Sequence, residues 1–276
     1  MKSNNQFRSL SAMFLVCVLV FTACKKKDTY DYDAADSHST SDNILKDINK
    51  VLNDAAADGG ISGKNESTSA NTCATVTLSP ADLVTFPKTV TVDFGLVGCT
   101  DQYGVHRRGK VTGVFTDYLH NPGSHVHVTF DGYYVNANKV EGIYDLANTS
   151  PNSSSRSFKD TITNGKITRA TDGKTITWNA TRYSNQTGGF GTAVLSDDEY
   201  TGGGQSAGVG FNGKNFTATS SNVVWKLACK YLVSGLVTIY SGTDPKPVNV
   251  DFGNGTCDNK YNVSYDIYNA DLTFWY

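Results

Sequence analysis

The segment 166–178, KITRATDGKTITW, contains the pattern that decides the fold. β-Branched and aromatic residues alternate with polar ones on both sides of Asp172-Gly173, and such alternation suits a half-buried pleated strand. Asp followed by Gly is typical of tight hairpin turns, whose central residues need a positive φ. The segment therefore predicts a β-hairpin in which Ile167-Thr168 pairs with the run from Thr175 to Trp178.

The same period of two recurs through residues 73–276. Clear examples are TVTL at 75–78, TVTV at 89–92, VHVTF at 126–130 and VTIY at 237–240. Asn164-Gly165-Lys166 and Asn212-Gly213-Lys214 add two further turn signals. This part of the chain shows no long helical period, so we expect an all-β body over 73–276. Its antiparallel strands should form either a sandwich-like domain or an elongated β-meander.

One amphipathic helix is expected before this body. The apolar residues recur at i, i+1, i+4, i+7 and i+8, and they are Ile44, Leu45, Ile48, Val51 and Leu52. Ser41 can cap the start of the helix, and Gly59-Gly60 can end it. We therefore expect a short helix over 42–58, followed by a polar linker over 59–72. Its apolar stripe should pack on the body, with partner binding as the alternative.

Residues 1–23 have the three parts of a secretory signal. Lys2 and Arg8 give a positive start, and the apolar run MFLVCVLVF follows at 13–21. This run is shorter than the roughly 20 residues that a membrane-spanning helix needs. Thr22-Ala23 then places small residues directly before Cys24. The segment predicts export of the chain and removal of residues 1–23.

The ending Thr22-Ala23-Cys24 resembles the lipobox of bacterial lipoproteins, with Phe21 where that pattern usually has Leu. The resemblance implies cleavage before Cys24, a diacylglyceryl group on its thiol and fatty acylation, as by palmitate, of the new amino terminus. Residues 24–41 would then be a polar tether from a membrane anchor, most typically in the outer membrane. The body would face either the periplasm or the outside. The alternative is an ordinary secretory signal that leaves Cys24 as a free thiol.

The charge balance bears on the partners of the chain. With 26 acidic and 24 basic residues the formal net charge is −2, and loss of Lys2 and Arg8 makes it −4 for the processed chain. Nucleic-acid-binding domains are usually strongly basic, so no nucleic-acid partner is expected. An apolar content of 39% also excludes a multi-span helical membrane protein.

Six cysteines divide by their position in the chain. Cys17 leaves with the signal, and Cys24 carries the lipid. An even number in an exported chain predicts two disulfides, because that compartment is oxidising. The four remaining cysteines are Cys73, Cys99, Cys229 and Cys257.

These four cysteines bound a duplicated unit, 73–99 and 229–257. Each unit opens with a strand, turns through a proline-containing loop and returns on a strand ending Val-Asp-Phe-Gly. Asp93 and Asp251 each stand six residues before the closing cysteine. The duplication favours Cys73–Cys99 and Cys229–Cys257 among the three connectivities that four cysteines allow. A strand-rich body with paired cysteines behind a lipobox resembles the β-rich lipoproteins of Gram-negative envelopes.

Two groups of residues could hold a metal ion. His120, His125 and His127 form a histidine cluster, and His125 and His127 lie on one face of an expected strand, as a metal site requires. Oxygen-rich turns could hold Ca²⁺, and their residues are Asp251, Asn254, Asp258, Asn259, Asp197, Asp198 and Glu199. Polar turns have the same composition without an ion, so we expect no cofactor and keep calcium as the alternative.

Aromatic residues offer a binding hypothesis. Six rings lie in or beside polar turns, namely Tyr103, Tyr118, Tyr133, Tyr134, Tyr183 and Trp178. Sugar-binding sandwiches present such rings to pyranose faces, and Tyr133, Tyr134 and Trp178 are the candidate ligand-binding residues. Filling of the core by the same rings is the favoured alternative. No HExxH motif occurs, and the GxSxG match GQSAG at 204–208 sits among expected strands rather than at a strand-to-helix turn, so we expect no enzyme.

We therefore predict a lipid-anchored cell-envelope protein with a non-enzymatic structural or binding role. A surface carbohydrate-binding lipoprotein is the second interpretation, and a metal-assisted hydrolase is the third. Besides the membrane that holds the lipid, the partner would be a glycan or another envelope protein.

Overall fold

The computed structural model describes residues 32–61 and 73–274. The predicted signal, the lipidation site Cys24 and most of the expected linker 59–72 lie outside the described residues. No helix in the described ranges is long and apolar enough to cross a membrane.

The described chain contains one α-helix, α1 (Asp33–Asp58), followed by strands alone. The strands are β1 (Thr75–Ser79), β2 (Lys88–Asp93), β3 (Cys99–Thr100), β4 (His106–Phe115), β5 (His125–Val135), β6 (Asn138–Asn148), β7 (Ser157–Thr168), β8 (Thr175–Gly188), β9 (Glu199–Val209), β10 (Asn215–Lys226), β11 (Ser234–Ser241), β12 (Val248–Asn254), β13 (Lys260–Tyr265) and β14 (Tyr268–Thr273).

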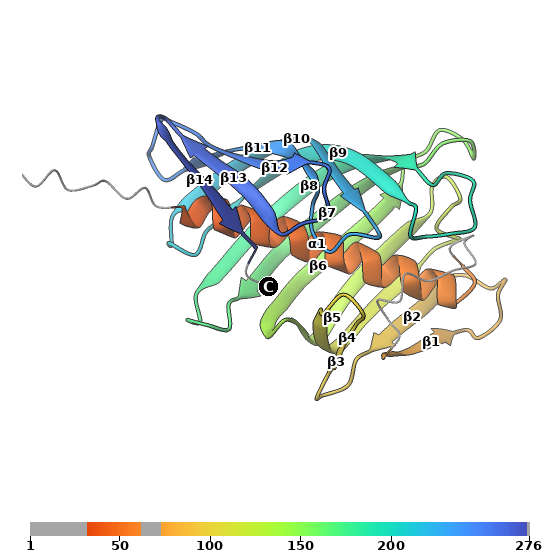
Figure 1. Ribbon diagram of the computed structural model, residues 1–276. Coiled ribbons are helices and arrows are strands. Elements are labelled where there is room, and N and C mark those ends of the chain that lie inside the picture. Colours follow the sequence, from red (N-terminus) through yellow and green to blue (C-terminus); the bar gives the residue numbers. More distant parts are fainter. Residues whose placement is uncertain (1–31, 62–72, 275–276) are drawn as a thin grey trace, which may run out of the picture.

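All the strands belong to one antiparallel sheet of 14 strands. Apart from the short β3, which pairs with β4, each strand pairs with the next along the chain, from β1 at one edge to β14 at the other. The all-β prediction is confirmed, in its meander form. Figure 1 shows that the sheet curves strongly and that α1 lies along its concave side.

Two of the three predicted turns join strands. Ile167 pairs with Ile176 across the β7–β8 hairpin, as the segment 166–178 predicts. Asn212-Gly213-Lys214 connects β9 to β10. Asn164-Gly165-Lys166 was predicted as a turn, and this prediction is wrong, because the tripeptide lies inside β7. Asn164 has a φ of 52° and the register shifts there. Bulges and turns share this need for positive φ, so the local signal does not separate them.

The helix differs from its prediction at its start. It begins at Asp33 and has 26 residues, so residues 33–41 are not part of a solvated tether and the helix is not short. Ser41 lies within the helix and donates from its hydroxyl to the carbonyl oxygen of His38 at 2.8 Å, rather than capping the start. The end agrees with the prediction: Asp58 is the last helical residue, and Gly60 follows with a φ of 67°.

The core fills the space between α1 and the concave face of the sheet. The apolar stripe of the helix is no more than 4% exposed, and its residues are Ile44, Leu45, Ile48, Val51 and Leu52. Inward-facing strand residues such as Val111, Ile167 and Ile239 are fully buried. Burial of each such side chain contributes about 1.5–3 kcal/mol, so the helix is the centre of the core.

Both predicted disulfides are present. Cys73 pairs with Cys99 at a Cα–Cα distance of 5.9 Å, and Cys229 pairs with Cys257 at 5.3 Å. The two units are also alike in detail. Asp93 accepts a hydrogen bond from the N–H of Gly95 at 2.8 Å, and Asp251 accepts one from Gly253 at 2.8 Å. The repeated sequence is therefore a repeated hairpin, formed by β1–β2 and again by β11–β12.

Candidate functional site

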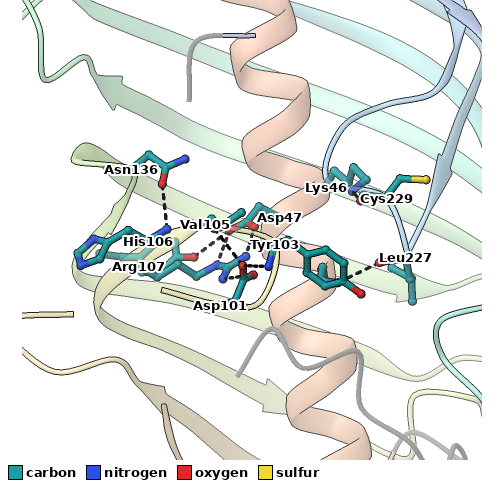
Figure 2. Close-up of polar contacts among 12 residues, drawn as sticks. Lys46, Asp47, Asp101, Tyr103, Val105, His106, Arg107, Asn136, Leu227 and Cys229 are labelled. Carbon is teal, nitrogen blue, oxygen red and sulfur yellow. Dashed lines mark hydrogen bonds and ion pairs between the residues drawn. The ribbon is translucent and has the colours of Figure 1, made fainter. Parts of the chain in front are cut away.

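A cluster of buried charge joins α1 to β4. Arg107 is 1% exposed, and its Nε donates to Asp47 Oδ2 at 2.9 Å while its Nη2 donates to Asp47 Oδ1. Its Nη1 donates to Asp101 Oδ2 at 2.9 Å. Figure 2 shows the guanidinium between these two carboxylates. Two-pronged pairing of this kind is the strongest form of a charged hydrogen bond.

The pairing of Arg107 with Asp47 favours the charged form of both side chains. Burial alone would raise the pKa of Asp47, but the charge and hydrogen bonds of Arg107 hold this pKa below its ordinary value. Burial would lower the pKa of Arg107, and Asp47 raises it instead. Asp101 also accepts from the backbone N–H groups of Tyr103 and Val105 at 2.8 and 3.0 Å. The cluster thus fixes the loop before β4 against the helix.

Two lysines of α1 reach the segment between β10 and β11. Lys46 donates to the carbonyl oxygen of Cys229 (Figure 2). Lys50 donates to the carbonyl oxygen of Leu227 at 2.9 Å. The ammonium of Lys50 also lies 4.2 Å from the ring centre of Tyr103. Burial, followed by the charge of Lys50, lowers the pKa of Lys46 to about 7. These contacts fix two backbone carbonyls of the loop between β10 and β11 against the helix.

A third polar group lies near the middle of the helix. Tyr144 donates to Asn49 Oδ1 at 2.6 Å and is 3.1 Å from Asp160 Oδ1. Burial raises the pKa of Asp160 to about 6. The two cavities beside Asp160 measure about 20 and 30 Å³, which is the size of a single water rather than of a substrate. The groups that join α1 to the sheet therefore position the helix.

Replacing Asp160 with Asn is expected to stabilise the protein at about pH 8 and to have little effect at about pH 4. The folded-state pKa is raised from 3.8 to about 6, so above pH 6 folding buries a charged carboxylate at a cost of about 3 kcal/mol. Below pH 4 the carboxyl is protonated in both states and this cost vanishes. Asn retains an acceptor for Tyr144. Urea unfolding at both pH values measures the effect, and an equal change at the two would contradict it.

The three predicted histidine ligands do not form one site. His127 Nδ1 lies 2.7 Å from Asp145 Oδ1, and His125 Nε2 lies 3.7 Å from the same oxygen. His120 instead lies against the ring of Tyr118, with 5.5 Å between the ring centres. Within residues 32–61 and 73–274, no three His, Cys, Asp or Glu side chains are arranged to hold a metal ion. Asp145, on β6, is the partner that the sequence did not indicate.

Three of the candidate calcium ligands accept hydrogen bonds within their own turns, and a fourth accepts one from a neighbouring strand. Asp251 accepts from the N–H of Gly253 as described above, and Asp258 accepts from the N–H of Lys260 at 2.9 Å. Asn254 accepts from the hydroxyl of Thr256 at 2.7 Å. In the other acidic turn, Asp198 accepts from Gln186 at 2.8 Å. These four side chains therefore already stabilise backbone and side-chain groups around them.

Two of the three candidate ligand-binding aromatics are buried, and the third is partly covered by an arginine. Tyr133 is fully buried and Trp178 is 3% exposed, so both fill the core. The guanidinium of Arg108 covers the ring of Tyr134 at 3.4 Å from its centre. The ligand-binding hypothesis fails at Tyr133 and Trp178, and the favoured alternative of core filling is confirmed there, because both side chains alternate onto the concave face of their strands. Proximity to a polar turn does not reveal that direction.

The outer face of β7–β10 contains a groove that the sequence analysis did not single out. Its volume is about 570 Å³, within the range of about 300–1,000 Å³ that small-molecule sites occupy. The side chains that face outward along it are Thr161, Thr163, Asn179, Thr181, Gln205, Ala207, Thr217 and Thr219. Seven of these eight carry a hydroxyl or an amide, and all eight are uncharged.

The period-two spacing of these residues is visible in the sequence as Thr-x-Thr at 161–163 and 217–219. That spacing alone is the ordinary pattern of a half-exposed strand. Pairing of four strands in register brings the separate runs together, and this pairing follows from the topology of the sheet.

No protein-family model, curated protein or solved structure matches this chain.

Proposed function

We propose that this chain is a lipid-anchored cell-envelope protein with a non-enzymatic binding role. The observation that carries the proposal is the groove of neutral polar side chains on the outer face of β7–β10. The buried charged groups around α1 are engaged with one another and with the backbone, and the cavities beside them are water-sized. The outer face is therefore where a partner of appreciable size can bind.

The cysteines support the envelope part of the proposal. Cys73, Cys99, Cys229 and Cys257 form two disulfides, which persist in oxidising compartments. The signal-like segment 1–23 and the lipobox-like Thr22-Ala23-Cys24 point to the same route of export. The eight residues between Cys24 and Asp33 can span at most about 28 Å. A lipid on Cys24 would thus hold the amino-terminal end of α1 close to the bilayer.

Labelling with radioactive palmitate in the bacterial host tests the anchor. The wild-type chain is expected to incorporate label and to fractionate with membranes, because acyl chains bind bilayers by about 0.8 kcal/mol per buried CH₂. Cys24→Ser should abolish both. Cys17→Ser is the matched control, since its thiol lies inside the signal and its label should be unchanged. Label retained in Cys24→Ser, or lost in Cys17→Ser, would contradict a lipid on Cys24.

A further inference from the structure

We propose that the groove across β7–β10 binds a neutral glycan, with the saccharide chain running across the strands. This inference rests on the binding role proposed above and gives its ligand class. It also moves the carbohydrate site from Tyr133, Tyr134 and Trp178 to the outer face of the sheet.

The chemistry of the groove matches sugar hydroxyls. Each Thr hydroxyl can both donate and accept a hydrogen bond. The side-chain amides of Asn179 and Gln205 donate from their nitrogen and accept at their oxygen. A pyranose presents a ring of groups with the same dual capacity. The side chains that line the groove are uncharged, so they offer no counter-charge to a uronic acid, a phosphate or an amine. The groove therefore favours a neutral saccharide over an ionic ligand.

The polar groups form a regular line across the sheet. Thr161 pairs directly with Thr181, Thr181 with Gln205, and Gln205 with Thr219. Neighbouring strands lie about 4.7–4.9 Å apart, so hydrogen-bonding groups recur at that interval along the row. The row continues to Thr238 and Asn249, whose side chains hydrogen-bond to each other at 3.0 Å. A regular row of this kind suits a ligand that is itself a repeating chain.

Two exposed tyrosines lie at the margins of the groove. Tyr183 is 57% exposed and takes the next outward position after Thr181 on β8, opposite Gly203, which has no side chain. Tyr240 is 47% exposed and pairs with Thr217 from the neighbouring strand β11. Aromatic rings at such positions stack on the apolar faces of sugars, while polar groups between them fix the orientation.

The opposite face of the strands that form the groove packs against α1. On β8 the side chains between those of the groove point toward the helix: that of Ala180 is buried, and that of Arg182 pairs with Asp42 of α1. The lining side chains also come from strands rather than loops. A site on such elements loses little entropy when a ligand binds, so short side chains can supply useful affinity.

Isothermal titration calorimetry of the full processed chain tests the ligand class. The probes are the neutral hexasaccharides cellohexaose, xylohexaose, mannohexaose and maltohexaose, with the anionic hexagalacturonate for comparison. We expect binding of at least one neutral probe and weaker or no binding of hexagalacturonate. If none of the neutral probes binds at millimolar concentration, or if the anionic probe binds more tightly, the proposal is overturned.

Variants then locate the site. Asn179→Ala combined with Gln205→Ala, and separately Tyr183→Ala, should each weaken binding of the neutral probe about tenfold. Matched controls outside the groove are Asn215→Ala for the amides and Tyr268→Ala for the ring, and these should bind as the wild type does. Circular dichroism and thermal melting establish that each variant is folded. All the substituted side chains are at least one-third exposed, so folding should be retained.

Equal weakening by the groove and control variants would overturn the location of the site. The two proposals can be rejected separately. If the wild-type chain incorporates no palmitate but binds a neutral glycan, only the lipid anchor is rejected. If it incorporates palmitate but binds no neutral glycan, only the glycan ligand is rejected.

Discussion

Replacing Arg107 with Ala is expected to lower the free energy of unfolding by about 3–5 kcal/mol. The substitution removes the partner of two carboxylates at once, because Asp47 and Asp101 both accept from the guanidinium. Both acids would remain beside the helix with a charge that the protein no longer balances. Equilibrium unfolding in urea at neutral pH measures the change.

Lys110→Ala is the matched control for this substitution. Lys110 lies on the same strand and pairs with Asp93 at 3.1 Å, but its side chain is 47% exposed. Exposed pairs contribute about 0–1 kcal/mol, so this variant should be close to the wild type. A loss in Arg107→Ala no greater than that in Lys110→Ala would show that the buried cluster does not hold the helix.

The pH dependence gives an independent signature of the same cluster. The pKa of Asp47 is lower in the folded state than its ordinary value. The stabilisation from this group is therefore present above about pH 4 and is lost as the pH falls further. In Arg107→Ala this acid-induced loss should diminish, because the cation that lowers the pKa of Asp47 is gone. Acid unfolding curves of the two proteins report the difference.

Removing either disulfide is expected to destabilise the protein by about 3–4 kcal/mol. The bonds close loops with sequence separations of 26 and 28 residues, so their effects on the unfolded chain should be nearly equal. Cys229 is 2% exposed and its carbonyl accepts from Lys46 of α1. We therefore expect Cys229→Ser/Cys257→Ser to lose more stability than Cys73→Ser/Cys99→Ser.

The test is the difference in stability between the two double variants. Cys73 is exposed and Cys99 is half-buried, so that double variant reports loop closure with little disturbance of the core. Urea unfolding of both double variants under identical conditions measures the difference. If Cys73→Ser/Cys99→Ser proved the more destabilising, the contact between Cys229 and the helix would not contribute as proposed.

The start of α1 shows where sequence reasoning reaches its limit. Residues 33–41 carry no apolar period, and a polar run of that kind is typical of a solvated tether. The structure buries these residues because the sheet supplies polar partners from distant positions. Asp36 pairs with Arg169 at 3.0 Å, and Ser37 accepts from the N–H of Phe211 at 2.9 Å. Partners that are more than 130 residues away leave no trace in the local pattern.

The candidate site shows the same limit in another form. Aromatic residues near turns were the natural candidates for sugar binding, yet Tyr133 and Trp178 face the core. Each threonine of the groove is an ordinary strand residue, so its own segment of sequence does not indicate a site. The pairing of four strands places Thr161 beside Thr181, and it places Gln205 between Thr181 and Thr219. The groove is thus a property of the register between strands rather than of any one strand.

The amino-acid sequence by itself determined the strand-rich body, the apolar stripe and end of the helix, and the pairing of four cysteines. These features depend on local alternation, on turn chemistry and on a repeat, all of which act over short stretches of chain. The tertiary structure alone decided that the helix starts at Asp33, that it lies against the concave side of one curved sheet, and which rows of side chains meet on the outer face. Each of these depends on contacts between residues far apart in the chain, and those contacts exist only once the sheet has packed against the helix.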